Sequence, residues 1–327
     1  VEALAGLPES PQLARALARR SQLEMLKQRP ESVEHAREAA AVARRVGDAF
    51  AEVNARINIF TQEAADGVPP DADELAAIID EAARAGVYEE AFRAVVNFTW
   101  SANGFMPLDR LDLVLTELRH RLGDVEAPLS IGPYLELSRA MVLLVPAGRW
   151  VEADRVIEAQ PPDIAASSHL VRLWVAGGLA FRRGDLETAE PLLTELRPEA
   201  LRSGEPQRII PMASAVLPWL ALTDREELRV LAEEVLDAVD GAWPPVLDCV
   251  PVVRALAATE EAHLLARVTA SIGKTPTVTA LSRTAMIVGE ALQALLNGQA
   301  TEAVGLLDKA VERQQEVRRT FEAACLE

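Results

Sequence analysis

The chain has 327 residues and a formal net charge of −17; half of its residues are hydrophobic, but only 4% are aromatic. A nucleic-acid surface needs clustered Lys and Arg, so this charge argues against direct nucleic-acid contact. Ala and Leu supply most of the apolar residues, and alternating runs of Val, Ile, Thr and Tyr are missing, which favours an all-α fold over a sheet. The length fits two or three ordinary domains or one extended array.

The two ends and the cysteines indicate the setting of the chain. Cys249 and Cys325 are isolated, which fits the reducing cytoplasm, and no apolar run approaches the length of about 18 residues that a membrane helix needs. The start VEALAGLPESPQL has neither an initiating Met nor the pattern of a signal peptide, and TFEAACLE (320–327) looks like the start of another helix. We therefore expect a cytoplasmic fragment of a longer protein, without membrane contact.

Turns divide the chain into helical segments. The first two turns fall at Arg29-Pro30 and Asp66-Gly67, and the segment 73–86 that follows has one apolar stripe with acids on its opposite face, as in an amphipathic helix. The next turn lies at Gly104. Beyond it, the stretch GDVEAPLSIGP (123–133) is rich in Gly and Pro and predicts an extended surface loop.

Three later segments share a spacing. GRWVEADRVI begins at Gly148, GDLETAEPLL at Gly184 and GQATEAVGLL at Gly298, and in each the Gly is followed by four residues and then Ala. Gly ends a helix in the left-handed conformation, and Asp185 is placed to cap the next one. The Ala, one turn later, lets that helix lie close to its predecessor. The pattern predicts tight antiparallel helix hairpins.

These turns recur along the whole chain. With Thr223-Asp224 and Thr259-Glu260 included, the marks lie 36 to 44 residues apart, at positions 30, 67, 104, 148, 184, 223, 259 and 298. A second series of breaks alternates with them, at Gly47, Gly86, Gly123, Gly204 and Gly273. Such a period is typical of helical-hairpin solenoids. A single continuous array is therefore favoured over separate domains.

The three Gly-to-Ala segments resemble the inter-helix turn of tetratricopeptide (TPR) repeats, Gly-Asp-Tyr-x-x-Ala, and Gly177 falls where that repeat carries its first-helix Gly. The usual Trp and closing Pro are mostly absent, and the period exceeds 34 residues. Segments 14–48 and 88–104 resemble the degenerate TPR-like arrays of ATP-dependent LuxR-type transcription regulators of the STAND class and of related multidomain nucleotide cyclases. The resemblance implies one right-handed superhelical solenoid over 1–327, with about seven to eight helix pairs.

Signatures of catalysis are missing. No GxxxxGK[ST] phosphate loop and no GxSxG elbow is present, and none of the four histidines lies at a recognised metal-ligand spacing. Adjacent carboxylates are typical of solvated helix faces. So are the basic pairs, which are far apart and flanked by acids: Arg19-Arg20, Arg44-Arg45, Arg182-Arg183 and Arg318-Arg319. We expect no enzyme, no cofactor and no metal.

In TPR-like arrays the first helix of each pair lines the concave face. Counting back from each turn by the resemblance gives the inward-facing candidates Asn54, Phe98, Ser101, Ser138, Trp174, Phe181, Arg182, Ile210 and Leu217. Trp174 and Phe181 are seven residues apart and so share a helix face, where they serve either as inter-helix core, the more ordinary role, or as ligand contacts. Trp100 and Trp219 align with a packing position of the repeat and are assigned to the core.

The function predicted from these features is a non-enzymatic helical-repeat sensor or scaffold region of a bacterial signalling or transcription regulator. In the resembling family, such an array follows a nucleotide-binding NTPase module. It would bind a small effector or a protein segment on its concave face and signal by changing its curvature. The alternative is a pure protein–protein interaction or self-association module. A hydrolase or isomerase would require a deep polar pocket with perturbed carboxylates.

Overall fold

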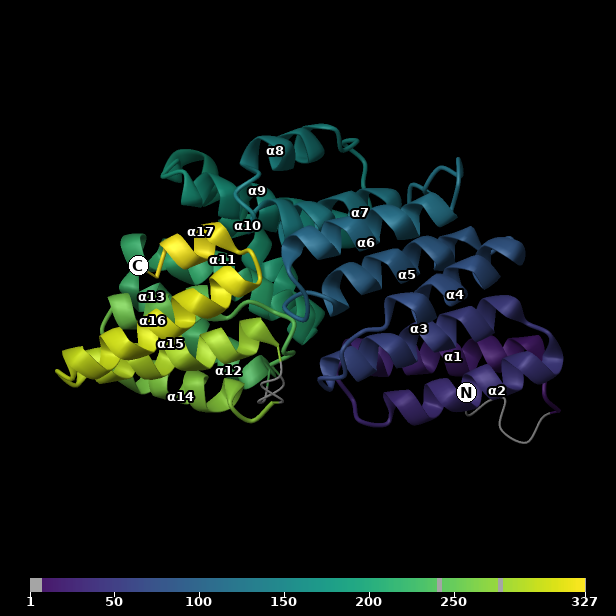
Figure 1. The fold of residues 1–327 in the computed structure, drawn as a ribbon, viewed down its shortest axis with the longest axis horizontal. Coiled ribbons are helices and arrows are strands. Elements are labelled where there is room, and N and C mark those ends of the chain that lie inside the picture. Colours follow the sequence, from purple (N-terminus) through teal and green to yellow (C-terminus); the bar gives the residue numbers. More distant parts are fainter. Residues whose placement is uncertain (1–7, 240–242, 276–278, 327) are drawn as a thin grey trace.

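The computed structural model describes residues 8–239, 243–275 and 279–326, and no strand occurs in these ranges (Figure 1). The prediction of an all-α chain is confirmed for this part. The helices are α1 (Pro11–Leu26), α2 (Ser32–Val46), α3 (Ala49–Ala65), α4 (Ala72–Arg84), α5 (Tyr88–Ser101), α6 (Leu108–Arg121), α7 (Gly132–Arg139), which continues as the π-helical turn η2 (Ala140–Leu144), α8 (Trp150–Glu158), α9 (Ala166–Arg182), α10 (Leu186–Ser203), α11 (Pro206–Thr223), α12 (Arg225–Val239), α13 (Val250–Ala258), α14 (Ala262–Ile272), α15 (Ala280–Leu296), α16 (Ala300–Glu316) and α17 (Thr320–Ala324). None of these helices is long and apolar enough to cross a membrane.

The odd-numbered helices follow one another in space as well as in sequence. From α1 to α15, each odd-numbered helix contacts the next odd-numbered one, and most also contact the even-numbered helix that follows. Figure 1 shows the series running from α1 and α3 through α7 and α9 to α13 and α15. The first helices of successive pairs therefore form one layer, against which the second helices pack.

The predicted turns separate these helices. Seven of the eight marks lie between an odd-numbered helix, or η2, and the even-numbered helix after it, and the mark at Thr223 is the last residue of α11. Gly104, Gly148, Gly184 and Gly298 have positive φ angles of 82°, 73°, 78° and 76°, a region that glycine enters without a steric cost. The predicted surface loop lies between the end of α6 and the start of α7. The marked residues thus lie at breaks between helices of the structure.

The residues around Gly184 cap and pack the helix that follows, as expected from the sequence. The Asp185 side chain caps α10 by accepting a hydrogen bond from the Thr188 backbone N–H at 3.1 Å. Ala153, Ala189 and Ala303, one turn into their helices, are all buried. A larger side chain at these positions would push the second helix of the pair away from the first.

Gly177 lies where α9 and α10 approach each other most closely. A Cβ atom at Gly177 would come within 2.8 Å of Leu193 Cδ2, and Leu193 is fully buried, whereas one at Gly178 would meet only Ala215 Cβ at 4.0 Å. Alanine gains up to about 1 kcal/mol over glycine in a helix, but overpacking costs about 1–3 kcal/mol. Gly177→Ala should therefore destabilise the protein by about 1 kcal/mol, and Gly178→Ala should stabilise it.

Urea denaturation of the two variants checks this prediction, since they differ by one position in one helix. Equal effects of the two substitutions would contradict the close approach of α9 and α10.

The turn between α5 and α6 contacts the far end of the chain. Gly104 accepts a hydrogen bond from the Ala280 N–H at 2.9 Å, and Leu108 donates one to the Val317 carbonyl at 3.1 Å. The close approach needs Gly104, because a Cβ there would lie 2.9 Å from Leu281 Cγ. In a simple solenoid each repeat contacts only its neighbours. These contacts depart from that rule and tie α15 and the end of α16 to the middle of the chain.

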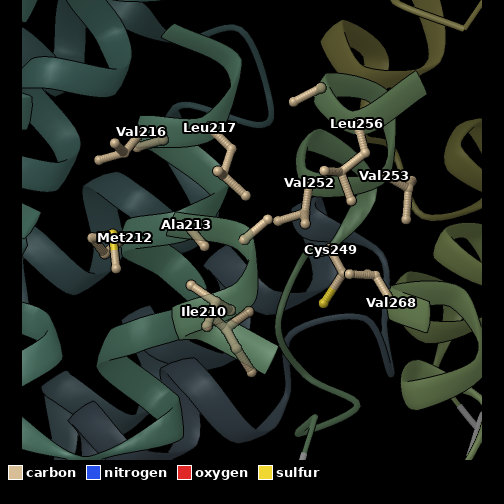
Figure 2. Packing of buried hydrophobic residues seen from close by; sticks show 14 of the residues in the cluster. Ile210, Met212, Ala213, Val216, Leu217, Cys249, Val252, Val253, Leu256 and Val268 are labelled. Atoms are coloured by element: carbon tan, nitrogen blue, oxygen red, sulfur yellow. The ribbon is translucent and has the colours of Figure 1, made fainter. Parts of the chain in front are cut away.

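The largest apolar cluster of the described residues is formed by α9 to α16, together with Leu326. Figure 2 shows its centre, where Ile210 and Leu217 of α11 belong to the same cluster as Val252 and Leu256 of α13. All four side chains are buried. This cluster fixes the spacing between α11 and α13, two helices that line the cavity described next.

Candidate functional site

A cavity of about 460 Å³ is lined by α9, α11, α13, η2 and α17. We call it cavity 1. Its walls are largely apolar and include Trp100, Trp174, Phe181 and Phe321. Such a volume, with aromatic walls and a few fixed polar groups, is typical of sites for small molecules or peptide side chains.

Three of the predicted residues meet in cavity 1. Trp174, Phe181 and Arg182 all come from α9 and all line it. Trp174 stacks on Trp100, with ring centroids 5.8 Å apart and planes inclined by 18°. The guanidinium of Arg182 lies over the Phe321 ring, 4.9 Å from its centroid, in a cation–π contact. The seven-residue spacing therefore places both aromatic rings and an adjacent cation on one wall.

A polar cluster lines another part of cavity 1. Arg319 Nη2 contacts Asp248 Oδ2 at 2.8 Å, and Arg319 Nη1 donates to Asn103 Oδ1 at 3.3 Å. The Asp248 carboxylate also accepts from the Val250 N–H at the start of α13, and its backbone carbonyl accepts from Ser214 Oγ of α11. The cluster therefore joins α11, α13 and the start of α17 to the turn after α5.

The two cysteines differ in their access to cavity 1. Cys325 lines it, whereas Cys249 is buried. Burial raises the pKa of the Cys249 thiol well above its ordinary value, and the negative charge of Asp248 raises it further. Cys249 is therefore held as the neutral thiol, the form that is neither a nucleophile nor a metal ligand.

A second cavity, of about 390 Å³, adjoins cavity 1. We call it cavity 2; it is lined mainly by α1, α3, α5, α9, α10 and α11. The two cavities share the stacked pair Trp100 and Trp174, together with Pro211 and Leu247. The tryptophan pair is thus a common wall of both cavities.

Of the other predicted residues, Ser101 lines cavity 2, although little of it is exposed. The remaining five are buried and line neither cavity: Asn54, Phe98, Ser138, Ile210 and Leu217. Each has a partner within the protein. For the polar pair, Asn54 donates to Glu90 and Ser138 accepts from Trp100 Nε1 at 3.0 Å. These five side chains are therefore packed inside the protein and do not face either cavity.

The charge of the cavity walls is opposite to that of the chain. The charged side chains lining cavity 1 are Arg182, Arg254, Arg319 and Asp248, and those lining cavity 2 are Arg19, Arg93 and Arg208. Asp248 is paired with Arg319. In a chain with a formal net charge of −17, the walls of both cavities carry an excess of cations. Arg93 and Arg208 are paired with Glu90 and Glu205, two carboxylates that do not line cavity 2.

Several of these residues could not be singled out from the sequence. Trp100 packs against the core as expected, but it also lines both cavities. The prediction that Arg318-Arg319 forms a solvated helix end is wrong for Arg319, which is only 3% exposed. Its partners Asp248 and Asn103 are distant in sequence, so no local pattern marks the cluster. Arg254 is exposed on α13, and nothing in the sequence distinguishes it from other arginines on helix surfaces.

Carboxylates with shifted pKa values lie elsewhere. Within the described residues, those whose pKa departs clearly from its ordinary value are all lowered: Glu9, Glu24, Asp112, Glu152 and Asp185. For Asp112, burial raises the pKa, but hydrogen bonds from Arg149 and Arg139 outweigh it. None of the five lines either cavity. No group of three or more His, Cys, Asp or Glu side chains in the described ranges is arranged to hold a metal ion.

Comparison of the chain with protein-family models, with curated proteins and with solved structures found no match.

Proposed function

We propose that this chain is a non-enzymatic binding region built as a TPR-like solenoid of antiparallel helix pairs, a single array over 1–327. The continuous layer of odd-numbered helices supports this proposal, because stacking of first helices is the defining arrangement of such arrays. The turn residues that resemble the TPR motif support it independently.

Cavity 1 is the proposed binding site, and its occupant is a small effector or a segment of a protein. The observation that carries this is the meeting of Trp174, Phe181 and Arg182 with the Arg319–Asp248 pair around one apolar space. Aromatic walls supply apolar contact area, while an arginine fixes the orientation of a polar or anionic end. Arg254 is exposed on the same cavity and is available for that role.

The proposed setting is a cytoplasmic bacterial signalling or transcription regulator of the LuxR-type or STAND class. This part rests on the resemblance of segments 14–48 and 88–104. The array would transmit binding to attached modules by a change in curvature. The helices around cavity 1 suit that role, since a ligand touching α9, α13 and α17 at once would alter the distance between distant helix pairs.

The assignment of cavity 1 is tested in two steps: a ligand is identified first, and residues that line the cavity are then substituted. A thermal-shift screen of small molecules and peptides identifies a ligand, whose affinity is then measured by titration calorimetry. Trp174→Ala should weaken binding by about 2 kcal/mol or more, the loss typical of a central aromatic contact. Arg254→Gln, at an exposed position, should weaken an anionic ligand without affecting the fold.

Trp219→Ala is the matched control, because Trp219 of α11 is also half-buried but lines neither cavity. Unchanged affinity in Trp174→Ala for a confirmed ligand would overturn the assignment of cavity 1. If the screen finds no ligand and light scattering shows a mass that rises with concentration, the self-association alternative is favoured. Exposed apolar side chains around the α15–α16 turn, Leu295, Leu296 and Val304, would then be the first candidates for the contact.

A further inference from the structure

Three arginines from distant parts of the chain meet at cavity 2. Arg19 belongs to α1, Arg93 to α5 and Arg208 to α11, and all three line the same space. No Asp or Glu among the described residues lines it, although acids outnumber Lys and Arg by 50 to 33 in the chain. Chance placement in so acidic a chain would bring carboxylates to the wall. The carboxylates of Glu90 and Glu205 pair with Arg93 and Arg208 but do not line the cavity, so the side chains that face it are cationic or uncharged.

Arg93 is held in place from behind. Its Nε donates to Glu90 at 2.6 Å, Nη1 to Asn58 Oδ1 at 3.1 Å and Nη2 to the Asn54 carbonyl at 3.0 Å. A guanidinium has five N–H donors, so two remain after these bonds. Its side chain is only 12% exposed, and its orientation is therefore fixed before any ligand arrives. This is the arrangement of a preorganised anion contact.

The other two arginines are less constrained. Arg208 contacts Glu205 through Nε at 2.8 Å, and Arg19 donates through Nη1 to the neutral side chain of Gln22. Burial lowers the pKa of the Arg93 guanidinium, and the nearby charge of Arg19 lowers it further, against the opposing effect of Glu90. Arg19 and Arg93 are thus close enough to repel each other. An anion between them would relieve that repulsion.

The rest of the wall is mainly apolar and aromatic, with a few uncharged polar side chains. The amides of Gln22, Asn97 and Gln207 line the cavity beside the arginines. Amide and hydroxyl groups suit the polar remainder of a small molecule, and a guanidinium pairs with phosphate or carboxylate through two parallel hydrogen bonds. The volume of about 390 Å³ exceeds what a lone inorganic ion fills.

We propose that cavity 2 is a separate binding site for a small polar molecule that carries a multiply charged oxyanion, either a phosphate or a cluster of carboxylates. Arg93 would contact the oxyanion from a fixed position. Arg19 of α1 and Arg208 of α11 would provide the other two contacts. The three arginines line cavity 2 and not cavity 1, although the two cavities share the wall of Trp100 and Trp174. Because the site joins the first helix pair to the sixth, its occupation would hold α1 and α11 at a fixed distance from each other.

The experiment compares two double variants of the full chain that have the same net charge. Arg19→Gln/Arg208→Gln removes two charges from cavity 2 and spares the buried Arg93. Arg20→Gln/Arg202→Gln removes one charge from α1 and one from α10. Both residues are exposed and line neither cavity. Pyrophosphate and citrate are titrated into each protein by calorimetry at constant ionic strength.

The unmodified protein should bind at least one probe saturably, with a dissociation constant in or below the millimolar range. The cavity variant should lose about tenfold or more of that affinity, and the control variant should keep it. Binding of pyrophosphate alone identifies a phosphate site, and binding of citrate alone a carboxylate site. No saturable binding of either probe, or equal loss in both double variants, would overturn the proposal. A ligand of cavity 1 should still bind to the Arg19→Gln/Arg208→Gln variant, which separates this test from that of the proposed function.

Discussion

Replacing Arg319 with alanine is expected to lower the free energy of unfolding by about 3 to 5 kcal/mol. The Arg319 side chain is 4% exposed and its partner Asp248 is 16% exposed, so the pair is largely shielded from water. Removing one partner leaves the other charge without compensation in a poorly solvated place. The loss is enlarged because Arg319 also donates to Asn103, which in turn donates to the Val246 carbonyl at 2.8 Å.

Equilibrium denaturation in urea measures this effect. Arg319→Lys retains the charge but cannot reproduce two separate contacts from one planar group, so a smaller loss is expected. Arg318→Gln is the control, since Arg318 is the exposed neighbour and should change stability by no more than about 0.5 kcal/mol. A similar, small effect of Arg319→Ala and Arg318→Gln would show that the cluster does not hold the C-terminal helices to the middle of the chain.

Phe98→Ala is expected to cost about 3 to 5 kcal/mol of unfolding free energy. Phe98 is fully buried on α5 and packs against Phe60 of α3, with ring centroids 6.2 Å apart. The substitution leaves a cavity between two neighbouring helices of the inner layer. Since Phe98 lines neither cavity 1 nor cavity 2, any loss of ligand affinity should follow only from loss of folded protein.

Leu129→Ala provides the comparison, because Leu129 lies in the loop between α6 and α7 and is 81% exposed. Its effect on stability should stay within about 0.5 kcal/mol. If the Phe98→Ala protein is as stable as the parent but binds its ligand poorly, Phe98 is a ligand contact and not a core residue.

The helix pairs could be predicted from sequence because their determinants are local. Gly184 ends a helix, Asp185 caps the next one and Ala189 allows close packing, all within six residues. Counting back from these turns along the preceding helix also identified Trp174, Phe181 and Arg182, which line cavity 1. It could not separate them from Phe98, Ile210 or Leu217, because helical periodicity shows which face turns inward but not whether a neighbour covers it.

The polar parts of both cavities escaped prediction for a different reason. Arg319 and Asn103 are 216 residues apart, and Arg19 reaches cavity 2 only because α1 and α11 line one space. No spacing within a single chain marks such meetings. Arg318-Arg319 therefore resembled any basic helix end until the fold placed one of its two side chains inside.

The contacts of the α5–α6 turn also bear on how the protein is made. Asn103 leaves the ribosome 216 residues before its partner Arg319. At the usual rate of synthesis, this delay is roughly 10 to 40 seconds, far longer than helices need to form. During that time the Gly104 carbonyl and the Leu108 N–H lack their partners Ala280 and Val317, and cavity 1 lacks the wall that Phe321 supplies. The binding site proposed here is therefore among the last parts of the molecule to be completed.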